Sequence, residues 1–427
     1  MQRLHNSFIG MVASSLVLTS ISTAILAGPK GSEFDLTLTP ASGGMEGVGV
    51  VRPQDPVAML FGNPSTLTQL NGDNAFTIGG TFVSPDLRSH TNDGVGLFGG
   101  PPGPTNPGIV APGSRGKSDF GEGAVPHAAA LHRINPDMVV GIGLTGISGL
   151  GSDFRNEAGF APLIADLKLF GGNMVVGYQV TPELSIGGAV TIGIGALQAG
   201  LASNSASVNA FGIGGTVGAT YDAGLIQLGG TYKSPLDIEY KRVTETSQGV
   251  FSNLDLEQPQ EVTFGIATTD AFMKDTFVEV NFRYKNWDDA NGYQDFWKDQ
   301  YIFSVGGQHR MPTRIGPVTL RAGYSYSSDL AKDRKDLGNS FGNFTQVFVP
   351  GQGVLPVTPA FIEVAQTTIT NGFWSQGVSF GIGYDITPKL TLDLNTSYAF
   401  DGNESFSGDL RSEGSIFSAG MGLTWNF

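Results

Sequence analysis

The sequence predicts an all-β protein, a 14-stranded antiparallel transmembrane β-barrel with an N-terminal plug in its lumen. Three observations predict this fold. Apolar and polar residues alternate with a period of two along many segments, and the charges in those segments fall only on the polar side. Short turns alternate with long connections, and the last and most regular segment ends on Phe427.

Composition excludes several other classes. The 427 residues include 62 glycines and only 15% charged side chains, which is unfavourable for a helix bundle. There is no cysteine, so disulfide scaffolds, thiol nucleophiles and Cys-ligated metal sites are excluded. The net charge of −14 would repel a phosphate backbone, so we expect no nucleic-acid partner.

The first residues are typical of a secretory signal peptide. Arg3 precedes a weakly apolar run from Phe8 to Leu26, and small residues follow. We assign residues 1–27 to this signal, against the alternative of a retained membrane anchor. The predicted location is the outer membrane of a Gram-negative bacterium.

Residues 28–72 show no sustained alternation but contain several glycines and prolines. A disordered leader is one interpretation. However, Val48, Val57, Leu60 and Phe61 are too apolar for a tail that stays in water. We therefore expect a plug of irregular backbone inside the lumen, followed by the barrel over residues 73–427.

The barrel strands follow from the alternation, beginning with a first strand from Phe76 to Val83. The uncharged run from Leu184 to Ala202 has the length of a membrane helix. However, one parity is shared by Leu184, Ile186, Val190, Ile192 and Ile194, which indicates a strand. Six short turns rich in Asn, Asp, Pro and Gly separate the hairpins. Seven longer loops complete the count of 14 strands, near residues 84–123, 148–170, 195–207, 233–258, 286–299, 328–374 and 401–413.

Local motifs resemble the FadL/TodX family of outer-membrane channels for long-chain fatty acids and other hydrophobic molecules. Asn63-Pro64-Ser65 is similar to the plug motif of the family, and Gly149 to Phe154 is similar to the stretch at a kink in its third strand. Weaker similarities lie at residues 44–47, 230–235, 284–287 and 320–324. Unlike the family, this chain has a short loop after the fifth strand, and its longest loops follow strands one and eleven.

The resemblance implies a plugged channel that captures hydrophobic ligands outside the cell and releases them sideways into the membrane. A lateral opening needs a break in strand pairing, which glycine-rich backbone permits. We therefore assign the gate to Gly149 and Gly151, with Phe154 beside them, and expect the plug around Asn63-Pro64-Ser65 to move with it. The alternative is that these glycines only pack a bent wall.

Further residues are candidates for ligand handling. Arg283 and Arg321 are predicted to face inward, where a guanidinium is suited to bind a carboxylate; Glu279 and Asp393 also face inward, so lumen salt bridges are the alternative. An apolar run within the loop at 328–374 suggests a capture surface or a segment folded onto the barrel rim, and its candidate residues are Phe344, Phe348, Leu355 and Phe361.

An aromatic group lies in the preceding loop: Trp287, Tyr293, Phe296 and Trp297. It indicates either part of the same capture surface or a girdle at the membrane interface.

Nothing in the sequence supports catalysis, a cofactor or a metal site. The dinucleotide-like pattern at residues 141–146 lies in a glycine-rich strand, and the hydrolase-like pattern at 338–342 lies in a polar loop. His127 and His132 share one strand and are five residues apart, so they should point to opposite faces.

We expect a monomeric, non-enzymatic channel whose partners are a hydrophobic small molecule, membrane lipid and lipopolysaccharide. The alternatives are a general diffusion porin for small polar solutes and an adhesion barrel that displays its loops.

Overall fold

The computed structural model describes residues 34–35, 39–97, 100–104, 106–201, 206–247, 249–340, 345–349, 353–369, 375–406 and 410–427. The signal segment predicted at residues 1–27 lies outside this part of the chain. Among the described residues, no helix has the length and apolar character needed to cross a membrane.

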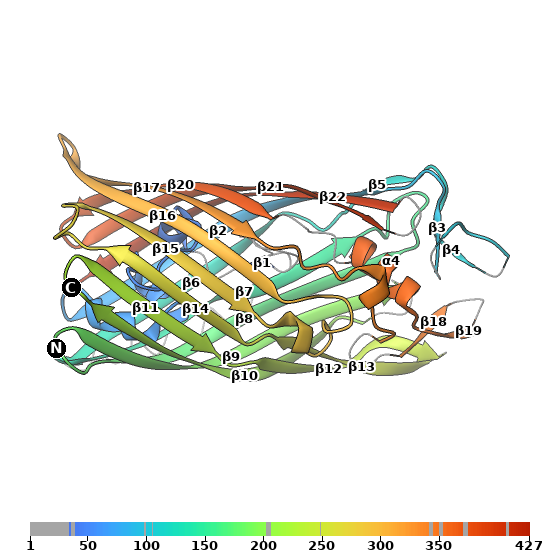
Figure 1. The fold of residues 1–427 in the computed structure, drawn as a ribbon, viewed down its shortest axis with the longest axis horizontal. Coiled ribbons are helices and arrows are strands. Elements are labelled where there is room, and N and C mark those ends of the chain that lie inside the picture. The colour runs from blue at the N-terminus through green and yellow to red at the C-terminus, as the bar shows by residue number, and fades with distance from the viewer. Residues whose placement is uncertain are drawn as a thin grey trace, which may run out of the picture.

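Fourteen antiparallel strands form a closed barrel, which confirms the predicted fold (Figure 1). Each strand pairs with the next in the chain, β7 pairs with β8, and β2 closes the barrel against β22. The strands are β2 Asn74–His90, β6 Gly123–Asn135, β7 Met138–Asp153, β8 Leu163–Gln179, β9 Leu184–Leu201, β10 Val208–Asp222, β11 Ile226–Lys233, β14 Glu261–Thr268, β15 Thr276–Lys285, β16 Gln300–Thr313, β17 Gly316–Ser327, β20 Gln376–Thr387, β21 Leu390–Phe406 and β22 Leu410–Asn426.

The pleat of each strand separates its two kinds of side chain. Ile186, Val190 and Ile194 on β9 are exposed on the outer face, whereas Ser185 is buried on the inner face. His127 is buried and His132 is exposed, so the two histidines lie on opposite faces as predicted.

The first strand is longer than the sequence alternation suggested. β2 begins before Phe76 and continues past Val83 to His90, which pairs with Arg411. Leu87 continues the buried inner face, while polar residues occupy the outer face. The outward-facing residues after Val83 are polar although the strand continues, so the loop that we predicted from residue 84 began too early.

The plug fills the end of the barrel where the C-terminus lies (Figure 1). It contains three short helical segments, not only irregular backbone: α2 Pro40–Gly43, α3 Pro56–Phe61 and the 3-10 helix η1 Pro64–Gln69. Each begins with a proline, and the residue before that proline caps the helix. The side chains of Thr39, Asp55 and Asn63 accept hydrogen bonds from backbone N–H groups of the first turn. Proline fits the first helical position because that position has no backbone hydrogen bond to lose.

Folded loops cover the opposite end of the barrel (Figure 1). Two hairpins and a helix stand out there, and shorter elements complete this end. They are β3 Val95–Gly96, β4 Gly108–Val110, β5 Arg115–Lys117, β12 Leu236–Ser247, β13 Val250–Gln258, η2 Trp287–Asp289, η3 Arg334–Asp336, β18 Gln346–Val349, β19 Gly353–Pro356 and α4 Pro359–Ile369. A two-residue strand, β1 Phe34–Asp35, pairs with β7.

Candidate functional site

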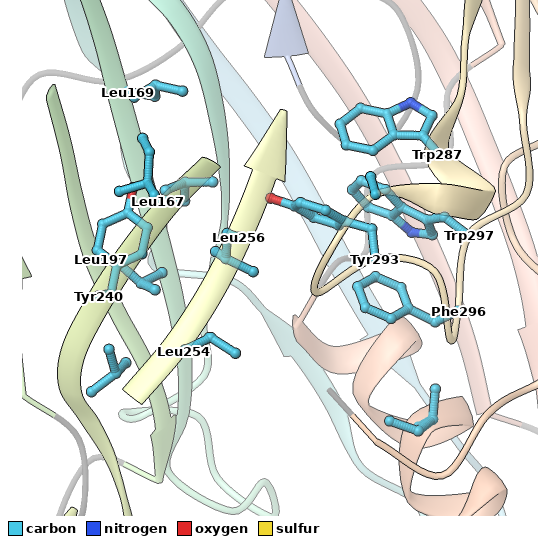
Figure 2. Packing of buried hydrophobic residues seen from close by; sticks show 14 of the residues in the cluster. Leu167, Leu169, Leu197, Tyr240, Leu254, Leu256, Trp287, Tyr293, Phe296 and Trp297 are labelled. Atoms are coloured by element: carbon cyan, nitrogen blue, oxygen red, sulfur yellow. The ribbon is translucent and has the colours of Figure 1, made fainter. Parts of the chain in front are cut away.

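A hydrophobic core fills the loop end of the barrel, and we call it the lid core (Figure 2). The hairpin β12–β13 supplies Leu236, Ile238, Tyr240, Leu254 and Leu256, which pack with the inward Leu167, Leu169 and Leu197 of the wall. The connection after β15 and the long loop after β17 supply the other side. The lid is therefore a packed structure held together by its apolar side chains.

The aromatic group lies inside this core. The rings of Tyr293 and Trp297 stack with centroids 4.6 Å apart, and Trp287 meets Trp297 edge-on at 4.8 Å (Figure 2). All four aromatic side chains, including Phe296, are at most 1% exposed. The girdle interpretation is therefore wrong, because rings at a membrane interface would face lipid.

The candidate capture residues lie in the same loop region. Leu355 and Phe361 are half-buried, and both pack against the lid core and a neighbouring cluster around Leu163 and Leu410. Phe348, in the hairpin β18–β19, is also half-buried. Phe344 lies outside the described residues. This loop folds onto the rim and mouth of the barrel.

Two acidic residues face each other on the lid hairpin. Asp237 on β12 is directly opposite Glu257 on β13. Partial burial, a hydrogen bond with Asp237 and the nearby charges of Asp237 and Asp289 together raise the pKa of Glu257 to about 7.

Below the lid, three cationic side chains surround one carboxylate. Glu261 lies 3.3 Å from Lys233, 3.4 Å from Arg283 and 4.0 Å from Lys285. Adjacent strands bring them together, since Glu261 is the register partner of both Lys233 and Lys285. Lys233, Glu261 and Lys285 line a cavity of about 90 Å³ whose floor includes Phe61 of the plug. Arg283 lines a smaller hollow beside it.

Sequence reasoning found Arg283 but missed the other three members. The available signal was that charged residues of opposite sign stand at the upper ends of consecutive strands. Only the register shows that they converge.

Arg321 lies elsewhere in the lumen and has a different environment. Its Nη1 donates to Oδ1 of Asp393 at 2.6 Å, and its Nε donates to Oε1 of Gln308 at 3.0 Å. The side chains of Arg321 and Asp393 are each only 6% exposed. The two predicted arginines are therefore not brought together into one site.

The plug motif Asn63-Pro64-Ser65 is wedged against the wall. Asn63 Nδ2 donates to the carbonyl of Val50 at 2.7 Å and to that of Ala219 on β10 at 3.2 Å. Asn63 Oδ1 accepts from the backbone N–H of Ser65 at 3.1 Å. A Cβ atom at Gly187 of β9 would overlap the backbone of Pro64, so the glycine permits this close approach.

A second plug attachment is made by Glu279 on β15. Its two carboxylate oxygens accept from the backbone N–H groups of Val51 at 3.1 Å and Arg52 at 2.9 Å. Glu279 is fully buried. The inward charge predicted as a salt-bridge partner therefore holds the plug backbone.

The barrel wall is interrupted at the predicted gate. β7 pairs with β6 only from Met138 to Leu144, and its register with β8 shifts between Gly146 and Ser148. Beyond that point the two-residue strand β1 pairs with Ser148 and Gly149. In the described wall, β6 and β7 therefore separate on the side toward the lid.

Aromatic rings pack at this interruption. A Cβ atom at Gly151 would overlap the ring of Phe120, which is buried. Phe154 is fully buried and stacks on Phe160 with centroids 4.9 Å apart. The backbone N–H of Asp119 donates to the carbonyl of Asp153 at 2.7 Å, which holds the segment carrying Phe120 against β7.

In the described part of the chain, no three His, Asp or Glu side chains are grouped so that they could hold a metal ion.

These features define a class: an outer-membrane β-barrel with a plugged lumen, a folded lid and an interrupted wall. Residues 37–224 match the family described as Outer membrane protein transport protein (OMPP1/FadL/TodX). The fold is that of FadL/TodX-type barrels, and this match confirms the resemblance stated from the motifs. The protein lies in the outer membrane of Gram-negative bacteria, as members of this family do, and that family consists of transport channels for hydrophobic compounds.

Solved structures share the fold at low sequence identity. The toluene transporter TodX of P. putida matches with a TM-score of 0.62 and 18% identity, over 91% of this chain and 98% of TodX. A FadL homologue of Pseudomonas aeruginosa gives 0.65 and 15%, over 93% and 100%. The toluene transporter TbuX of Ralstonia pickettii gives 0.60 and 17%, over 91% and 98%. No curated protein matches the sequence.

Proposed function

We propose that this protein takes up long-chain fatty acids or other hydrophobic molecules across the outer membrane. The observation that carries the proposal is the stretch of β7 that has separated from β6, beside a plug that fills the lumen. A hydrophobic molecule gains about 0.8 kcal/mol per CH₂ on leaving water, so an aqueous pore is a poor route for it. A dry passage that ends sideways in the membrane is a better one.

In this mechanism, ligand first enters the apolar lid, where Phe348, Leu355 and Phe361 lie at the edge of the packed region. It then reaches the cavity above the plug. Displacement of the plug around Asn63-Pro64-Ser65 opens the route to Gly149 and Gly151. The ligand leaves between β6 and β7 into the membrane. A diffusion porin is less well supported, because the plug occupies the path that polar solutes would use.

The cations at Lys233, Arg283 and Lys285 suit a ligand with a carboxylate head. Charge-assisted hydrogen bonds of this kind contribute about 1.5–3 kcal/mol. The head would join the three cations already held around Glu261, and the tail would extend along the apolar lid residues such as Leu236.

Arg283→Gln tests the head-group role. We expect the Kd for a long-chain fatty acid to rise about tenfold, while the Kd for an uncharged alkane of equal length is unchanged. Arg310→Gln is the matched control, since Arg310 forms an ion pair with Asp385 that is more exposed. Binding is measured on purified protein in detergent. Equal losses for both ligands would exclude a carboxylate role for Arg283.

Gly149→Trp tests the gate. A bulky side chain in the stretch of β7 that has separated from β6 should add at least about 1.4 kcal/mol to opening, which slows passage through this gate about tenfold. Gly172→Trp is the control, because Gly172 lies on β8 and a Cβ atom there meets nothing within 4 Å. Folding is confirmed by the heat-dependent gel mobility of the barrel. Undiminished uptake of both toluene and a fatty acid would remove this gate from the mechanism.

A further inference from the structure

The wall has a second irregular place, between β10 and β11. Their pairing ends at Thr216 and Lys233, and the chain then turns inward to form β12. Residues 208–214 of β10 continue toward the lid paired with β9. Among the described strands, none pairs with the other edge of these residues. The hairpin strand β12 instead lies inside the barrel, with Asp237 and Ile238 against the inner face of Gly212. The described barrel is thus opened at this seam as well.

One serine ends the paired part of the seam. The backbone N–H of Ser234 donates to the carbonyl of Gly215 at 2.8 Å. In return, the backbone N–H of Gly215 donates to the side-chain oxygen of Ser234 at 2.9 Å, not to a backbone carbonyl. One of the two hydrogen bonds of this last link is therefore accepted by a rotatable hydroxyl, so opening the link breaks a single backbone–backbone hydrogen bond.

Hollows lie on both sides of this link. The cavity of about 90 Å³ above the plug is on the inside, and a groove of about 620 Å³ lies on the lipid-facing side. Both are lined by Gly215, Thr216 and Ser234. The wall between lumen and lipid is therefore a single layer of small residues at this place.

The groove has an apolar lining and a glycine floor. Its sides are the exposed side chains of Met174, Val176, Val190, Val217 and Tyr232. On the floor, the nearest atom to a Cβ added at Gly188 lies 3.9 Å away, so the missing side chain leaves open space. Four strands, β8 to β11, contribute to this surface, which has the chemistry of a site for one hydrocarbon chain.

We propose that the seam at Gly215 and Ser234 is a second lateral port, and that the groove binds the hydrocarbon chain of the ligand passing through it. This proposal rests on the proposed function. A ligand held at Lys233 in the cavity lies next to Thr216 and Ser234, so its tail has a direct path outward. Because a cavity of about 150 Å³ accommodates benzene, the inner hollow of about 90 Å³ must widen, and release of Ser234 widens it toward the groove.

A reversible lock tests the port. The chain has no cysteine, so Gly215→Cys/Ser234→Cys introduces the only two thiols. These positions face each other across an antiparallel pair, at a separation that a disulfide tolerates. We expect oxidation to remove about half of dodecane uptake by cells, the share of one of two parallel exits, and dithiothreitol to restore it. The reduced double variant has the same bulk and serves as the control.

Occupancy of the groove is tested separately on purified protein. Tyr232→Trp places an indole at the groove rim, and we expect 1-bromododecane to quench it saturably. Adding Gly188→Leu fills the groove floor and should abolish the saturable quenching. Adding Gly172→Leu, which adds the same bulk to the lipid-facing side outside the groove, should leave it unchanged.

The outcomes separate the two proposals. If the oxidised and reduced forms of the double variant give equal uptake, while Gly149→Trp lowers uptake in the same assay, the second port is overturned and the proposed function stands. Wild-type uptake no greater than that of cells without the protein overturns the proposed function. The groove is then judged by quenching alone, and equal quenching in the Gly188→Leu and Gly172→Leu backgrounds overturns the binding site.

Discussion

Arg321→Met is expected to lower the free energy of unfolding by about 3–5 kcal/mol, because it leaves the carboxylate of Asp393 buried without its partner. The geometry makes the effect large. Both side chains are nearly excluded from solvent, and the atoms that join them are 2.6 Å apart. Unfolding in urea, followed by the fluorescence of the barrel in detergent, measures the difference.

Two further variants decide the cause. Arg321→Met/Asp393→Leu removes both charges and should recover most of the lost stability, since apolar replacement of a buried pair is often neutral. Arg310→Met breaks an exposed pair with Asp385 and should cost less than about 1 kcal/mol. If Arg321→Met costs no more than Arg310→Met, the buried pair is not a structural element of the wall.

Glu279→Ala is expected to loosen the plug and convert the closed barrel into a conducting one. The substitution removes the acceptor of two backbone N–H groups of the plug, those of Val51 and Arg52. A buried donor left unpaired, such as the N–H of Val51, costs about 1–3 kcal/mol, which is a large fraction of what holds a short segment in place. Single-channel recording in planar bilayers should show frequent large openings that the unmodified protein lacks.

Glu279→Gln keeps one carbonyl acceptor and should give an intermediate opening frequency. Glu183→Ala removes an exposed carboxylate at a periplasmic turn and is the matched control. The same conductance in Glu279→Ala and Glu183→Ala would show that this contact does not hold the plug.

The wall could be predicted from the sequence because the pleat imposes a period of two on every strand. Leu184 to Ile194 alternates, and the structure buries Ser185 and exposes Ile186 accordingly. Glu279 and Asp393 were placed inward by the same rule. Their partners were not predictable, because the rule gives the face of a side chain and not its neighbours. One residue binds the plug backbone and the other binds Arg321.

The packing of the lid could not be predicted from the sequence. Its core joins segments far apart in the chain, such as those that contain Leu254 and Trp297. Neither segment has a periodic pattern from which the contact could be predicted. Aromatic residues near a strand end fit a girdle equally well by composition. The plug helices, in contrast, had a local signal in the pairs Thr39-Pro40, Asp55-Pro56 and Asn63-Pro64, which combine a capping side chain with a first-turn proline.

The lid core also has a consequence for selectivity. In the proposed mechanism, a molecule that enters this packed cluster of leucine and aromatic side chains would be retained according to the apolar area that it removes from water. Partitioning ranks molecules by hydrophobicity and hardly at all by outline. In the proposed uptake, discrimination by shape or charge would therefore fall to the narrower space around Glu261, so that the first step would concentrate a broad mixture and the second step would sort it.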